Sequence, residues 1–248
     1  MRTLSRTAAL DPLLDLLAEA ERLRGAPLGV HAPLVAADPG DWSSPADLTP
    51  GLVTSLSDEI AAGYGAPRHV GASFLWKSYA YWTAYPIALG WALNRRVPLF
   101  TWDNAVFRVG DPRVSVAIRA PRAALVAGDA HADGPGTVAV PSGRALAGVI
   151  RREILEGHFT PLIKVINAAT RAGERNLWGT VAEAFAHPLL SLAPLILDGD
   201  GRREAEELLS LLALDHLVEF APEFRRRTCC LYVTVPDAKV CATCCVRR

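Results

Sequence analysis

The chain has 248 residues, enough to bury a sizeable hydrophobic core in one large domain or two small ones. Half of the residues are hydrophobic and 21% are charged, which is the balance of a soluble folded protein. Because 26 basic residues cancel 26 acidic ones, the composition argues against a general surface for nucleic acid or anionic membranes, although it leaves a local basic patch open.

The N-terminal stretch predicts an amphipathic helix that starts near Asp11, with leucines at positions 13, 14, 17 and 23. No apolar run typical of a signal peptide precedes its charges. We therefore expect a cytoplasmic protein. Thiols stay reduced in that compartment, so clustered cysteines there are more often metal ligands or redox groups than structural disulfides.

Two further helices are predicted over residues 49–65 and 73–96. The second contains an uncharged run, "SYAYWTAYPIALGWALN", from Ser78 to Asn94. Its 17 residues are short for a bilayer span and include three tyrosines and Pro86. We expect a buried helix, kinked at Pro86, and no transmembrane segment. Peripheral association with a membrane stays open.

The pattern of residue types changes between Val97 and Val140, where short runs rich in β-branched residues are bounded by glycine or proline. These runs, at 98–109, 113–120 and 136–141, predict a small antiparallel sheet. The segment "GDAHADGPG" between the last two runs is predicted to be a surface loop.

Helical patterns return after Ser142. One or two helices are predicted over 142–170, broken near Gly157, and others over 173–197 and 202–217.

The predicted fold class is α+β, rich in helix, with a small antiparallel sheet and a short C-terminal lobe in which cysteines ligate a cluster. We divide the chain into an N-terminal α+β part (1–141), a helical part (142–222) and a cysteine-bearing tail (223–248).

All five cysteines lie in this tail, in the pattern C-C-x10-C-x2-C followed by one more cysteine. Disulfides would suit a secreted protein, but neither a signal peptide nor cysteines elsewhere in the chain support that class. Adjacent cysteines also rarely form a disulfide with each other. Structural zinc is usually held by two C-x2–4-C pairs, and the adjacent first pair does not fit one. A binuclear iron–sulfur cluster takes two thiolates per iron. A catalytic thiol lacks an obvious histidine base nearby. Spacing alone divides zinc and [2Fe–2S] about evenly. The cysteines are Cys229, Cys230, Cys241, Cys244 and Cys245.

The arginine-rich "RRRTCC", the ten residues "LYVTVPDAKV" and the closing "CATC" resemble the C-terminal signature of FhuF-type ferric-siderophore reductases. The likeness of the cysteine motif covers about 20 residues. Residues 158–189 resemble the helical region of the family in their pattern of residue types, which extends the likeness, more weakly, over most of the chain. This family resemblance implies a [2Fe–2S] cluster held by Cys229, Cys230, Cys241 and Cys244. Cys245 departs from the four-ligand pattern, and we favour Cys244 as the last ligand because it keeps the two-residue spacer.

The resemblance also implies a cytoplasmic enzyme that reduces ferric siderophores and releases Fe(II). Hard oxygen ligands hold Fe(III) far better than Fe(II), so one electron makes the bound iron exchangeable. The sequence has no dinucleotide fingerprint and no P-loop, so we expect a separate electron donor and no nucleic-acid partner. Two alternatives stay open: a zinc-stabilised binding module, and an iron–sulfur electron carrier that reduces no siderophore.

The sequence offers two candidate regions for binding the siderophore. The first region surrounds a predicted helix break at Gly173 and contains Arg171, Arg175 and Trp178. The two arginines could offer guanidinium donors, and the tryptophan a stacking plane, to an oxygen-rich chelate. Seven aromatic residues crowd residues 74–91, and they form either core packing or the wall of a groove. The arginines that flank the cysteines have two possible roles: they bind an acidic electron donor or an anionic chelate, or they form a solvated basic tail without a specific role. These arginines are Arg225, Arg226, Arg227, Arg247 and Arg248.

Overall fold

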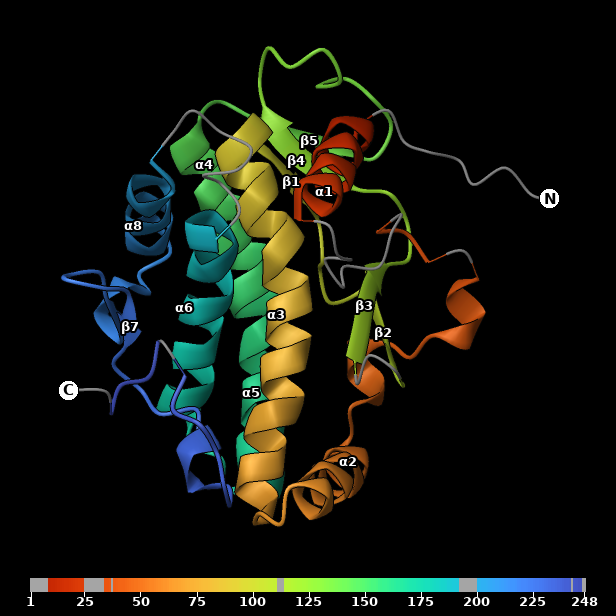
Figure 1. Cartoon of the computed structure of the whole chain (residues 1–248). Helices are drawn as coiled ribbons and strands as arrows, with labels where there is room; N and C mark the ends of the chain where they lie inside the picture. Colours follow the sequence, from red (N-terminus) through yellow and green to blue (C-terminus); the bar gives the residue numbers. More distant parts are fainter. Residues whose placement is uncertain are drawn as a thin grey trace.

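A long helix, α3 (Arg68–Asn94), forms the centre of the computed structural model, with α5 and α6 beside it (Figure 1). It packs most extensively on α6 and α2. Gly71 allows the close approach of α2, since a Cβ atom there would lie 2.1 Å from the carbonyl oxygen of Ser57.

The structure describes residues 9–24, 34–36, 38–110, 114–191, 200–241 and 243–246. The other main helices are α1 (Asp11–Arg24), α2 (Pro50–Gly63), α4 (Gly143–Val149), α5 (Thr160–Thr170), α6 (Glu174–Ser191) and α8 (Gly201–Leu211).

The strands form three small sheets at the edges of this helical body (Figure 1). Two of the sheets are antiparallel pairs, β2–β3 and β6–β7. The third has the order β1-β4-β5, and its β4–β5 pair is parallel. The predicted α+β, helix-rich class with a small antiparallel sheet is therefore confirmed in its main features: the pairing is mostly antiparallel, but the strands form three small sheets and the β4–β5 pair is parallel. The strands are β1 (Arg96–Pro98), β2 (Ala105–Val109), β3 (Val114–Ile118), β4 (Ala123–Val126), β5 (Thr137–Val140), β6 (Val218–Glu219) and β7 (Arg225–Arg226).

The predicted helix break near Gly157 is wrong. The chain stays helical from α4 through η3 (Ile150–Phe159) into α5, and η3 is a π-helix. Its wider turns are seen at its end, where the amide of Thr160 donates to the carbonyl of Leu155. The break at Gly173 is confirmed: Arg171 takes a left-handed conformation (φ 62°) between α5 and α6.

One continuous hydrophobic cluster runs from Ala9 to Val218 and crosses the proposed boundary at residue 141. The division into three parts stays a prediction. None of the helices in the described part of the chain combines the length and hydrophobicity that a membrane span needs.

His158 of η3 is fully buried in this core. Its Nδ1 lies 2.7 Å from the carbonyl oxygen of Phe100, which can only accept, so Nδ1 carries the proton. Nε2 then accepts from the hydroxyl of Tyr79, also at 2.7 Å. Burial lowers the pKa of His158 to about 4, so the imidazole is neutral at pH 7.

Candidate functional site

The C-terminal lobe, by which we mean residues 223–246, docks on α6 through a buried ion pair. Nη1 of Arg226 donates to Oε2 of Glu183 at 3.0 Å, and both side chains are at least nine-tenths buried. Nη2 of Arg226 donates to the hydroxyl of Thr180, also at 3.0 Å. From the far end of the lobe, the hydroxyl of Thr243 donates to Oε1 of Glu183 at 2.9 Å. One carboxylate thus binds both ends of the lobe to α6.

Glu183 is held ionised in this buried position. Burial opposes its ionisation, but the charges of Lys77 and Arg226, together with the hydrogen bond from Thr243, outweigh that effect. The pKa of Glu183 therefore lies below its usual value.

The side chain of Thr228 in the lobe packs directly on the backbone of α6 at Gly179. A Cβ atom there would lie 1.7 Å from the hydroxyl oxygen of Thr228, the residue just before the first two cysteines. A side chain at position 179 would push the lobe away from the helix.

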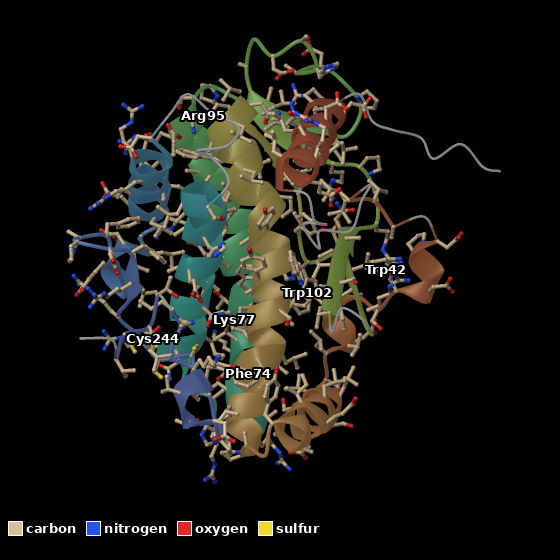
Figure 2. All side chains as sticks on the ribbon, viewed as in Figure 1. Trp42, Phe74, Lys77, Arg95, Trp102 and Cys244 are labelled. Carbon is tan, nitrogen blue, oxygen red and sulfur yellow. The ribbon has the colours of Figure 1, made fainter. Side chains whose placement is uncertain are left out.

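A cavity of about 600 Å³ opens between α3, α6 and the lobe. In Figure 2, Lys77 and Phe74 lie on α3, and Cys244 lies in the lobe at the side of the helical body. A volume of this size is typical of small-molecule sites. The residues that line the cavity are Tyr64, Phe74, Lys77, Ser78, Tyr81, Trp82, Glu183, His187, Cys230, Tyr232, Cys241 and Thr243.

Aromatic rings make up much of the cavity wall. Phe74 packs edge-on against Tyr64, and its ring centroid lies 5.8 Å from that of the tilted ring of Tyr232 in the lobe. Tyr81 packs edge-on against Trp82, at 4.7 Å. The aromatic residues of α3 thus have both predicted roles, core packing and the wall of a cavity. The core-packing residues are Trp76, Tyr79, Tyr85 and Trp91, which are buried.

The cysteine thiols have different surroundings. Cys230 and Cys241 line the cavity. Cys245 neighbours Cys229 and Cys244, and its burial, together with the charges of those two thiols, raises its pKa to about 11. The amide of Leu231 donates to Sγ of Cys229 at 3.3 Å. The fifth cysteine therefore lies among the predicted ligands.

Within the described ranges, no three Cys, His, Asp or Glu side chains converge as they do around a bound metal ion. Thiolates are the usual ligands of iron–sulfur clusters, and the lobe supplies five thiols.

No family model and no curated protein matches this chain. The function of the chain is therefore inferred from its residues and from the resemblance of its cysteine pattern.

The predicted siderophore-binding residues lie apart from the cysteines. Arg175 and Trp178 line a second cavity, of about 470 Å³, which shares no lining residue with the first. Arg171 is exposed and lines neither cavity. The structure thus brings two of these three residues together, away from the candidate cluster lobe.

Of the flanking arginines, Arg226 is not part of a solvated tail, because its side chain is 2% exposed. Arg227 is half-exposed and pairs with Glu219. Arg247 and Arg248 lie outside the described residues.

Sequence reasoning missed Lys77, Glu183 and Thr243 as parts of this site. One signal was available for Glu183, which is the sole charged residue in the otherwise apolar stretch "VAEAFA". A carboxylate on a buried helix face requires a partner, and an arginine is the usual one.

Proposed function

We propose that the protein is a cytoplasmic one-electron reductase of ferric siderophores that releases Fe(II). The observation that carries the proposal is the C-C-x10-C-x2-C pattern in a lobe whose Cys230 and Cys241 face a cavity of small-molecule size. The family resemblance of this pattern supplies the reaction.

In this proposal, Cys229, Cys230, Cys241 and Cys244 hold a [2Fe–2S] cluster, which supplies one electron at a time. The amide of Leu231, already directed at Sγ of Cys229, would stabilise that sulfur as a thiolate. Glu183 and Arg226 hold the lobe against α6, so that two of the thiols stay at the cavity wall.

The chelate binds in the cavity between α3 and the lobe. One electron converts its Fe(III) to Fe(II), which the hard oxygen donors hold weakly, and the iron is then exchanged. The electron is replaced by a separate one-electron donor, because the sequence offers no nucleotide or flavin motif.

The visible spectrum of anaerobically purified protein tests this proposal. We expect a brown protein with charge-transfer bands, and chelate-dependent release of Fe(II) measured with a ferrous-iron trap. A colourless protein that contains zinc would contradict the proposed reductase and indicate a zinc-stabilised binding module. Coloured protein without chelate-dependent Fe(II) release would indicate an electron carrier.

Single serine variants identify the fourth ligand. Cys244→Ser should lose the visible bands, whereas Cys245→Ser should keep them. The reverse result would assign the ligand position to Cys245, which lies beside Cys229 in the structure.

A further inference from the structure

Thr243 is fixed between the carboxylate of Glu183 and the sulfur of Cys241. A turn in which the amide of Cys244 donates to the carbonyl of Cys241, at 3.2 Å, brings Thr243 beside that cysteine. The carbonyl of Thr243 accepts from the amide of Arg226 at 3.1 Å. Its hydroxyl oxygen lies 2.9 Å from Oε1 of Glu183 and 3.8 Å from Sγ of Cys241. The side chain of Thr243 thus contacts both a carboxylate and a predicted cluster ligand.

The hydroxyl of Thr243 has one proton to share between these two groups. Since Glu183 is held ionised, its Oε1 can only accept a hydrogen bond. The hydroxyl therefore donates to Glu183 and presents a lone pair, not a proton, to Sγ of Cys241. Hydrogen bonds to the ligand sulfurs are one of the factors that set the reduction potential of an iron–sulfur cluster. A donor at the sulfur stabilises the more negative reduced state, so withholding that donor keeps the potential lower.

We propose that Glu183 is a positioning residue, which keeps the reduction potential of the cluster low because it holds the hydroxyl proton of Thr243 away from Sγ of Cys241. A lower potential gives the electron a larger driving force toward Fe(III), which hard oxygen ligands stabilise against reduction. This inference rests on the cluster of the proposed function and does not depend on which chelate is reduced. It gives Glu183 a role beyond the docking of the lobe.

The substitution Glu183→Gln should reverse the direction of this hydroxyl. Nη1 of Arg226 and Nζ of Lys77 lie 3.0 and 3.5 Å from Oε2 of Glu183, so the amide oxygen of the glutamine takes that position. Its NH2 group then replaces Oε1 and donates to the hydroxyl oxygen of Thr243, whose proton turns to Sγ of Cys241. The expected result is a higher midpoint potential, measured by a spectroscopic redox titration of the full chain.

Loss of a negative charge also raises the potential, so a double-mutant cycle with Thr243→Val separates the two effects. In the natural chain, Thr243→Val should leave the potential unchanged, because the hydroxyl gives the sulfur no hydrogen bond. In the Glu183→Gln chain, the same substitution should lower the raised potential. Glu219→Gln is the matched control, since Glu219 also pairs with an arginine of the lobe, Arg227, but this pair is exposed to solvent. It should leave the potential unchanged.

Pulsed EPR of the reduced cluster in deuterated buffer supplies a second measurement. A signal from an exchangeable deuteron close to a ligand sulfur should appear in Glu183→Gln and be lost in the double variant. A change in the packing of the lobe alone would not produce this pattern.

A lower potential in Thr243→Val alone, or equal potentials in Glu183→Gln and the double variant, would overturn the inference. If Glu183→Gln loses the cluster because Arg226 is left unpaired, the result for Thr243→Val decides by itself. A coloured protein that shows these shifts but releases no Fe(II) contradicts the proposed reductase alone. A coloured reductase without the shifts contradicts this inference alone, and a colourless chain contradicts both.

Discussion

Two adjacent arginines in the lobe have opposite environments. The side chain of Arg226 is 2% exposed and pairs with the buried Glu183, whereas that of Arg227 is 49% exposed and pairs with the equally exposed Glu219. Removing one partner of a buried pair leaves the other charge poorly compensated, while exposed pairs contribute little. The two positions therefore form a natural matched comparison.

We expect Arg226→Met to lower the free energy of unfolding by about 3 kcal/mol, and Arg227→Met by less than about 1 kcal/mol. Urea denaturation measures both values. Limited proteolysis should also cut the lobe of the Arg226 variant faster, since Glu183 no longer holds it. Equal, small losses in the two variants would show that the ion pair does not hold the lobe.

His158 gives the protein a specific dependence on pH. Its pKa is about 4 when folded and about 6.5 when unfolded, so between these values the unfolded chain binds the extra proton. The folded state therefore loses stability as the pH falls from about 6.5 to 4, by roughly 3 kcal/mol from this residue. Above pH 6.5 the residue adds no pH dependence.

The measurement is urea denaturation at several pH values for the natural chain and for His158→Gln. The glutamine keeps one donor and one acceptor but does not titrate. We expect its stability to fall less steeply below pH 6.5, and the difference between the two curves isolates His158 from the other titrating groups. Parallel curves would contradict the assignment of a buried neutral imidazole.

At the scale of elements, the sequence predicted the helices better than their connections. The helix at Asp11 was found because its leucines follow helical spacing, and α3 was found because its long uncharged run is typical of a buried helix. The break at Gly157 was wrong, because π-type hydrogen bonding continues through that glycine, where a Cβ atom would lie 3.1 Å from the carbonyl of Arg152. A pattern of residues does not distinguish a widened turn from a helix end.

The parallel pairing of β4 and β5 was missed for a different reason. Short connections usually join antiparallel strands, whereas parallel ones need a longer crossover. Here the loop after β4 reverses twice, helped by Gly128 (φ 94°) and Gly136 (φ 77°). The glycines marked a loop in the sequence, but not its path.

The candidate site was predicted in part. The cysteine pattern located the lobe, because ligand spacing is local in sequence. The surface that the lobe covers was not predictable, since its contacts join Glu183 to Arg226 and Thr243, far along the chain. Two of the three siderophore residues chosen from sequence, Arg175 and Trp178, line a second cavity for the same reason.

For the whole molecule, the arrangement of the core suggests that the helical body folds without the lobe. The main hydrophobic cluster ends at Val218, and within the lobe Phe224 packs against it while still partly exposed. The lobe is held mainly by the β6–β7 pairing, by polar contacts at Glu183, by the contact between the rings of Tyr232 and Phe74, and by the close approach at Gly179.

A chain ending at residue 222 tests this separation. We expect it to keep its helical circular dichroism and a cooperative thermal transition, because the apolar burial that drives folding lies upstream. Some stability should be lost, since Glu183 loses Arg226 and Thr243 as partners. Adding Glu183→Gln to the shortened chain removes the uncompensated charge and should recover much of that loss. If the shortened chain is unfolded even with this substitution, the lobe is part of the same folding unit as the helices, and the boundary at residue 222 has no physical basis.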